Sequence, residues 1–204
     1  MSEESKNPRI PGPDAVSGDR YGAPMTSSPQ IEPQIEPTVG PAVEPTIEDW
    51  PEQPYLALTG IVTLETIGTV EQRVPELLAH LAAQGLEPAG APFIRYRVID
   101  MFRRLEIEAG VPLAAPVRTD GEPHCDVLPA GRYVTHTFVG RPEDHIPVIG
   151  AIFTWAAERN LAWDVAPGEE GDEWGGRLSS TLAGPPEGTD TNALTTKFAF
   201  RLAD

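Results

Sequence analysis

Tyr96 and Glu106 offer the clearest chemistry in this sequence, because an aromatic hydroxyl and a carboxylate fall in two neighbouring strand-like segments. Residues 91–99 and 101–111 alternate apolar and polar side chains, as half-buried strands do. Tyr96 could line a pocket for a small molecule, and Glu106 could attract a cation or transfer a proton. The alternatives are a core tyrosine with an outward hydroxyl, and a solvated glutamate or one paired with Arg104.

Phe102 shares the face of Glu106 and Arg104, whereas Leu105 and Ile107 take the opposite face and are expected in the core. We therefore count Phe102 among the candidates for contact with a ligand.

Trp163 and Trp174 flank residues 166–172, which are rich in Gly and Glu and are expected to form a mobile loop. Either indole could stack on a planar ligand, because flat rings favour such contacts. The alternative for both is ordinary packing against the second predicted helix.

Lys197 lies in the last predicted strand, where Phe198 and Phe200 alternate with it. The phenylalanines are expected to pack on the helices, so Lys197 would face the open, concave side of the sheet. The alternative is a lysine that only reaches solvent at a strand end.

Other groupings lack the pattern that their chemistry requires. His124-Cys125-Asp126 has no second ligand pair at zinc spacing. His136 has no serine or cysteine nucleophile placed beside it, and residues 168–176 lack the Lys-Ser/Thr ending of a phosphate loop. We therefore assign no residue a catalytic role, and we expect no metal and no other cofactor.

A faint internal repeat with an offset of 72 residues indicates how these residues are positioned. The matches are Val62-Thr63 with Val134-Thr135, Gly68 with Gly140, Glu71 with Glu143, Val74-Pro75 with Ile146-Pro147, and Ala79 with Ala151. Each copy is predicted as strand, helix, strand, strand.

In the first copy, residues 55–66 form the opening strand, and Thr69 with Gln72 fits a helix capping box. Pro75 then fits only the first turn of a helix that starts late, and Gly85 is a natural stop. The second copy comprises residues 127–139, 141–160, 174–182 and 194–202.

The predicted fold is α+β: two strand-helix-strand-strand units pair into one curved antiparallel sheet. We expect both helices on one face and a ligand pocket on the other.

Composition divides the chain near Trp50. Residues 1–49 hold nine acidic and three basic side chains, and eleven of the 23 prolines lie between Pro8 and Pro54. Such a segment cannot bury enough apolar area to order itself, so we predict a disordered acidic tail over 1–49 and one domain over 50–204. The tail is interpreted as an inert leader, or as a spacer that docks a protein partner.

Charge and cysteine content limit the possible binding partners and the cellular compartment. The net charge of −16 argues against direct nucleic-acid binding, which needs clustered Lys and Arg. A single cysteine, Cys125, fits a reducing cytoplasm. Neither a signal peptide nor a membrane-spanning stretch is recognised, so we expect a cytoplasmic protein without membrane contact.

Several strings in order resemble the GyrI-like family, the effector-binding domains of bacterial transcription activators. They are Leu105-Glu106-Ile107-Glu108-Ala109-Gly110-Val111-Pro112, Leu128-Pro129-Ala130-Gly131-Arg132-Tyr133, Gly140, Trp155, and Thr195-Thr196-Lys197-Phe198-Ala199-Phe200. The resemblance covers residues 53–204 and implies the duplicated fold described above. It also implies small-molecule binding. The family includes drug sensors, binders of toxins or dyes, a gyrase inhibitor and hydrolases of cyclopropane-containing antibiotics.

The resemblance implies pocket glutamates on the last two strands, where this sequence departs from the pattern. Ser179 and Thr181 stand at the glutamate and tyrosine positions of one motif, and Lys197 stands at the glutamate of the other. Losing both carboxylates favours a neutral or partly anionic ligand over a cation, or a degenerate catalytic site.

The leading hypothesis is a stand-alone binder of a small, largely hydrophobic aromatic compound, because no DNA-binding module precedes the domain. The alternatives are a hydrolase of a strained or reactive molecule and, last, a module that binds an enzyme through its acidic surface.

Overall fold

The computed structural model describes residues 42–184 and 192–204. The tail predicted over residues 1–49 falls mostly outside these ranges, and only 42–49 can be compared. Within the described residues, no helix is long and apolar enough to cross a membrane.

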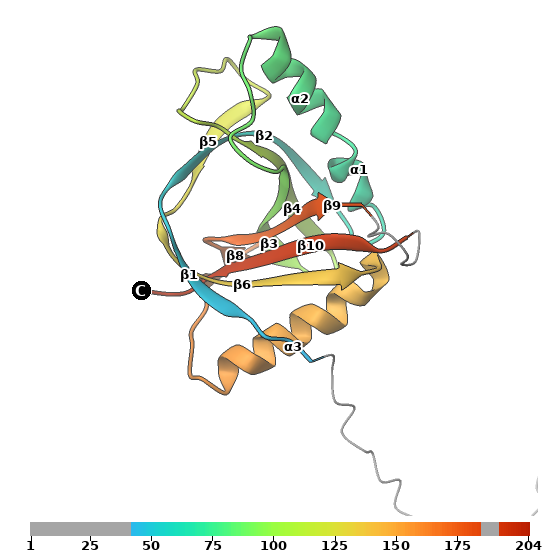
Figure 1. The fold of residues 1–204 in the computed structure, drawn as a ribbon, viewed down its shortest axis with the longest axis vertical. Coiled ribbons are helices and arrows are strands. Elements are labelled where there is room, and N and C mark those ends of the chain that lie inside the picture. Colours follow the sequence, from blue (N-terminus) through green and yellow to red (C-terminus); the bar gives the residue numbers. More distant parts are fainter. Residues whose placement is uncertain (1–41, 185–191) are drawn as a thin grey trace, which may run out of the picture. The chain divides into compact units, whose positions relative to one another are not determined.

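One antiparallel sheet forms the domain (Figure 1). Its strands are β1 (Thr46–Trp50), β2 (Gln53–Val62), β3 (Phe93–Asp100), β4 (Arg104–Pro112), β5 (His124–Leu128), β6 (Gly131–Gly140), β7 (Val165–Gly168), β8 (Gly171–Trp174), β9 (Arg177–Ala183) and β10 (Leu194–Arg201). The helices are α1 (Gly68–Glu71), α2 (Val74–Ala83) and α3 (His145–Ala157), with a 3-10 turn, η1 (Pro142–Asp144).

The strand order β1-β6-β10-β9-β3-β4-β2-β5 confirms the predicted duplication. In the first copy β4 lies between β3 and β2, and in the second β10 lies between β9 and β6. The two copies meet where β3 pairs with β9, through Ile94 opposite Ser179 and Arg95 opposite Leu178.

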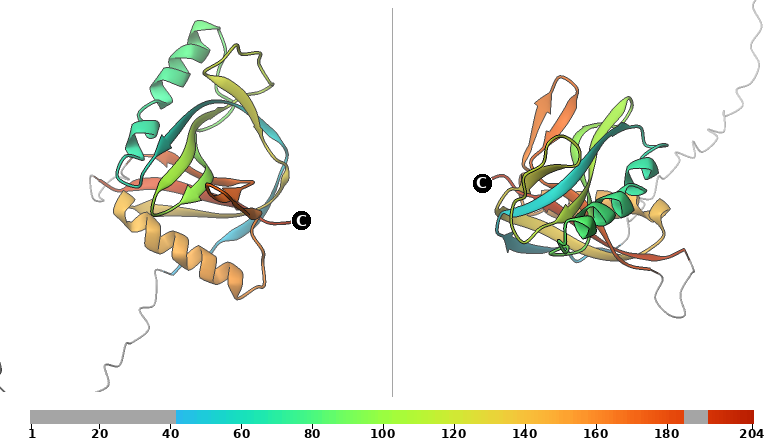
Figure 2. Two further views of the ribbon diagram at one scale, coloured as in Figure 1. Left: turned by 180° about the vertical axis from the view of Figure 1, so that it is seen from behind. Right: turned by 90° about the horizontal axis from the view of Figure 1, so that it is seen from above.

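The sheet curls, with α2 and α3 on its outer side (Figures 1 and 2). Its helix face carries Leu58, Ile107 and Phe198, which belong to the larger hydrophobic core with Leu77 of α2 and Ile152 of α3. Alternation places the neighbouring residues on the other side, called here the inner face.

The inner face has its own small core of Tyr55, Phe93 and Tyr133, each at most 5% exposed. Gly110 makes this packing possible, because a Cβ there would lie 2.5 Å from the ring of Phe93. A curled sheet thus buries side chains on both of its faces.

The first predicted helix forms in two pieces. Pro75 occupies the first turn of α2, as predicted, and Gly85 ends the helix region with a φ of 68°. The capping box at Thr69 is wrong: α1 has Ile67 at its N-cap, and the Thr69 hydroxyl donates to the carbonyl of Thr66.

Three short segments differ from the sequence prediction. β1 begins at Thr46, inside the segment that composition assigned to the tail, because its backbone pairs with β6 from Thr46 to Trp50. β5 covers the other end of the sheet by pairing with β2. Residues 166–172, predicted as a mobile loop, lie in the β7–β8 hairpin, which pairs with β3 and stands out from the sheet in Figure 2.

Candidate functional site

A cavity of about 310 Å³ lies on the helix face, between α1 and α3 and over the strands at which the two copies meet. Its lining is Leu64, Ile67, Glu71, Tyr96, Ile99, Met101, Leu105, Pro142, His145, Ile146, Ile149, Arg177, Leu178, Ser179, Phe198 and Phe200. Most of these side chains are apolar. A ligand pocket was expected on the face away from the helices, whereas this cavity lies on the helix face.

Strand alternation explains which sheet residues reach the cavity. Ser179 lies between Ile94 of β3 and Phe198 of β10 in the register, and all three project toward the helices. Arg177 precedes Ser179 by two residues and therefore takes the same face. The rim comes from loops and the start of α3, where Leu64, Met101 and Ile146 are 44%, 44% and 65% exposed.

A second hollow of about 270 Å³ adjoins the cavity and adds polar groups. The two share Glu71, Tyr96, His145 and Ser179. Thr181 and Thr196 line the second hollow, and the Thr196 hydroxyl is buried without a hydrogen-bond partner among the described residues. The His145 Nε2 atom is likewise buried and unpartnered there.

Burial sets the ionisation of the groups around this space. It lowers the pKa of His145, against a weaker opposing effect of Asp144, so the neutral imidazole is favoured near pH 7. Burial raises the pKa of Tyr96, whose hydroxyl lies 3.5 Å from the Ser179 Oγ atom. It also raises the pKa of Glu71 above its usual value.

Arg177 is the cation of the cavity. Its guanidinium carbon lies 5.0 Å from the ring centroid of Trp174 and 5.4 Å from that of Tyr96. Phe153 and Phe200 complete the surround at 5.8 and 5.7 Å. No oxygen of residues 42–184 or 192–204 accepts a hydrogen bond from the Arg177 guanidinium. Burial lowers the pKa of Arg177.

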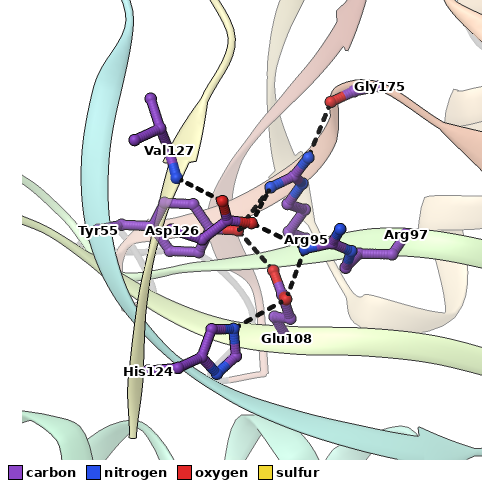
Figure 3. Close-up of polar contacts among 8 residues, drawn as sticks. All are labelled: Tyr55, Arg95, Arg97, Glu108, His124, Asp126, Val127 and Gly175. Carbon is purple, nitrogen blue, oxygen red and sulfur yellow. Dashed lines mark hydrogen bonds and ion pairs between the residues drawn. The ribbon is translucent and has the colours of Figure 1, made fainter. Parts of the chain in front are cut away.

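A contrasting cluster of charges occupies the inner face (Figure 3). The Tyr55 hydroxyl donates to Glu108 at 2.6 Å, and Arg97 donates to Glu108 at 3.0 Å and to Asp126 at 2.8 Å. Arg95 donates to Asp126 and to the Gly175 carbonyl, both at 3.1 Å.

His124 Nε2 lies 3.4 Å from Glu108, and the Val127 N–H donates to Asp126 at 2.8 Å. Burial and the charge of Glu108 raise the pKa of Tyr55 far above its usual value, so the phenol stays protonated. Two arginines face two carboxylates, so the cluster is electrically balanced. We refer to Tyr55, Arg95, Arg97, Glu108 and Asp126 as the inner cluster.

A polar hollow of about 470 Å³ on the inner face borders this cluster. Arg95, Arg97, Glu106, Asp164 and Glu173 are among its lining residues. Glu106 therefore lies across the sheet from the apolar cavity, where Arg104 is 3.5 Å away. In the described part of the chain, no group of three or more His, Cys, Asp or Glu could hold a metal ion.

Of the predicted site residues, Tyr96, Ser179 and Thr181 come together on the helix face. Lys197 takes the inner face, as alternation predicts, but its Nζ lies 3.0 Å from Glu48 and it does not reach the cavity. Phe102 is 98% exposed in the turn between β3 and β4.

The two candidate tryptophans belong to the packed aromatic group under α3. Trp163 lies 5.1 Å from Phe153 between ring centroids, and Trp174 lies 5.9 Å from the same ring. Trp174 is 8% exposed and adjoins the site through its contacts with Arg177 and Phe200.

Sequence reasoning missed Arg177, Glu71 and His145. The signal for Arg177 was present: period two from Ser179 and Thr181 places it on their face. The positions of Glu71 and His145 depend on how α1 and α3 dock, which no local pattern specifies.

Comparison with known proteins agrees with this geometry. The family described as "GyrI-like small molecule binding domain" matches residues 43–170. No curated protein sequence matches the chain.

Three solved structures are similar in fold. EcmrR in its DNA complex has a TM-score of 0.61 and 14% identity, over 79% of this chain and 57% of that chain. SAV2435 bound to tetraphenylphosphonium has a TM-score of 0.52 and 9% identity, over 78% and 94%. A hydrolase from Listeria innocua has a TM-score of 0.51 and 10% identity, over 81% and 94%. This chain thus spans little more than half the length of the EcmrR chain.

Proposed function

Because the chain belongs to the GyrI-like small-molecule-binding family, we propose that it binds small, largely apolar aromatic compounds in the cavity on the helix face. The observation that carries the proposal is an apolar cavity in which the Arg177 guanidinium and the His145 Nε2 atom lack hydrogen-bond partners within the described residues. A volume of about 310 Å³ is at the lower end of small-molecule sites.

The apolar rim supports an organic ligand over water as the occupant. Leu64, Met101 and Ile146 leave much of their surface uncovered around the mouth. Apolar surface that a ligand removes from water contributes about 25 cal/mol per Å² to binding. Ile149 and Phe198 extend the same surface inward.

Fluorescence titration with N-phenylnaphthylamine, a neutral aromatic probe that brightens in apolar surroundings, tests the proposal. Ile149→Trp fills the cavity and is expected to weaken probe binding by about tenfold or more, which corresponds to about 1.4 kcal/mol. Val139→Trp, on a side chain that is 50% exposed, is the matched control and should leave binding unchanged. Equal binding by all three proteins would contradict the proposed site.

Hydrolysis of a strained or reactive small molecule is the second candidate. Glu71 and Tyr96 face the same cavity, and the raised pKa of Glu71 suits a general acid. Release of nitrophenolate from a nitrophenyl ester, lost in both Glu71→Gln and Tyr96→Phe, would favour the hydrolase. Recovery of the unchanged ester after long incubation would favour a binder.

The biological role that we attach to this site is sequestration or sensing of a drug or natural product in the cytoplasm. The single cysteine, Cys125, supports a reducing compartment. Retention of a labelled aromatic antibiotic by cells that express the chain, and its loss with Ile149→Trp, would test this role.

A further inference from the structure

Among the cations of the described residues, Arg177 is exceptional. Nine arginine and lysine side chains there lie within 4.0 Å of a carboxylate: Arg73, Arg95, Arg97, Arg103, Arg104, Arg141, Arg159, Lys197 and Arg201. Arg118 and Arg132 have no such partner but are exposed to water. Arg177 is partly buried and has neither a carboxylate nor full hydration.

The surrounding rings satisfy only part of the guanidinium. Aromatic faces stabilise the positive charge, but they leave the N–H donors of the planar group without acceptors. None of the side-chain nitrogens of Arg177 is among the fully buried atoms that lack a partner, so its donors are open to the cavity. A bidentate acceptor fits these donors best, and carboxylates and sulfonates provide one.

The aromatic surround also fixes the guanidinium in place. The rings that contact it come from four elements: Trp174 from β8, Tyr96 from β3, Phe153 from α3 and Phe200 from β10. A side chain held in this way loses little further conformational freedom when an anion binds.

We propose that the ligand of this cavity is an aromatic organic anion, a carboxylate or sulfonate, whose acid group is bound by Arg177. The inference rests on the proposed function, because it names the ligand class of the same cavity. The apolar walls contact the ring system, and the acid group lies against the guanidinium.

Glu71 does not neutralise Arg177. The two side chains line the same cavity, yet no ion pair within 4.0 Å joins them. Burial raises the pKa of Glu71, so its carboxyl is more readily protonated than an ordinary one, and in the protonated form it would donate a hydrogen bond to the ligand without repelling an anion.

Anilinonaphthalene sulfonate and N-phenylnaphthylamine test this class, because they share a ring skeleton and differ by the sulfonate. Without a cation in the site the sulfonate would weaken binding, since its desolvation would be uncompensated. We expect the wild-type protein to bind the sulfonate about tenfold or more tightly than the neutral probe. Competition between the two probes shows that they share a site.

Arg177→Gln is expected to weaken sulfonate binding by about ten- to a hundredfold and to change neutral-probe binding by less than about twofold. Arg159→Gln is the matched control, because it removes the same charge from a side chain that is 48% exposed and lies just beyond the C-terminal end of α3, away from the cavity residues His145 and Ile149. It should alter neither affinity.

The outcomes separate the two proposals. If neither probe binds, the proposed function fails. If the neutral probe binds and the sulfonate binds equally or more weakly, or if Arg177→Gln leaves the sulfonate affinity unchanged, the anion proposal alone is overturned. Should Arg177→Gln fail to fold, Arg177→Lys and the wild-type comparison of the two probes still decide.

Discussion

The cavity on the helix face and the inner cluster are both rich in charged and aromatic groups, but they differ in how those groups are satisfied. In the inner cluster two arginines meet two carboxylates at 2.8–3.1 Å. In the cavity Arg177 and His145, and in the adjoining hollow Thr196, have polar atoms without partners among the described residues.

We infer from this difference that the inner cluster stabilises the fold and that the cavity binds a ligand. The charges of the inner cluster are balanced and hydrogen-bonded to one another. They join β2, β3, β4 and β5 on the inner face. Groups left unsatisfied beside an apolar hollow cost stability, and a ligand that supplies their partners recovers that cost.

Breaking the inner cluster should have the largest effect on stability. Glu108 is 1% exposed and receives hydrogen bonds from Tyr55 and Arg97. Glu108→Leu removes the acceptor of Tyr55 and leaves Asp126 as the one carboxylate that faces both arginines of the inner cluster, so the free energy of unfolding in urea should fall by about 3–5 kcal/mol. Glu106→Gln, two residues along the same strand and 31% exposed, should lose less than about 1 kcal/mol. Similar losses in the two variants would refute the distinction.

The next comparison exchanges an arginine for methionine on each face. Arg95→Met leaves Asp126 and Tyr55 with fewer partners and should lower the free energy of unfolding by about 3 kcal/mol. Arg177→Met leaves no carboxylate without a partner, so the free energy of unfolding should change by less than about 1 kcal/mol in either direction. Urea titrations of both variants check this order, and a larger loss at Arg177 would reverse our assignment of roles.

A smaller, pH-dependent effect is expected at Glu48, which pairs with Lys197 on the inner face. Although burial opposes it, hydrogen bonds from Thr135, Trp50 and Lys197 lower the pKa of Glu48 from 4.5 to about 2. A carboxylate with a lowered folded-state pKa stabilises the protein above its unfolded pKa, and this contribution is lost as the pH falls toward 2.

Glu48→Gln should therefore reduce stability by less than about 1 kcal/mol at pH 7, because the pair is partly exposed. The difference from the wild type should shrink as the pH falls from about 5 to about 2. Thermal unfolding of both proteins across this range measures it. A difference that grows on acidification would show that the sign is wrong.

The smallest effect is expected for Ser179→Ala. Its contact with the Tyr96 hydroxyl, at 3.5 Å, is at the limit of a hydrogen bond. Stability should change by less than about 0.5 kcal/mol, and the affinity for N-phenylnaphthylamine should stay within about twofold. A loss as large as that of Ile149→Trp would make Ser179 a principal ligand contact.

Local patterns predicted much of the architecture. The 72-residue repeat predicted two copies of one unit, and the mirrored strand order on either side of the β3–β9 pair confirms it. Pro75 and Gly85 fall where their backbone preferences require. β1 and the β7–β8 hairpin were missed, because pairing with distant strands orders segments whose composition resembles a loop or tail.

The candidate site was harder to predict. Alternation along one strand puts Ser179 and Thr181 on the same face, but it could not show that Tyr96 of β3 shares this face, or that the apolar cavity lies there. Lys197 was placed on the correct side of its strand, yet only the structure reveals Glu48 of β1 beside it.

The sequence by itself determined the secondary elements, the duplication and the two-sided patterning of each strand, because these follow from backbone preference and side-chain alternation along neighbouring residues. Only the tertiary structure decided which charges are paired and which are left facing a hollow. That depends on contacts such as Arg95 with Asp126, or on their absence at Arg177, between residues far apart in the chain.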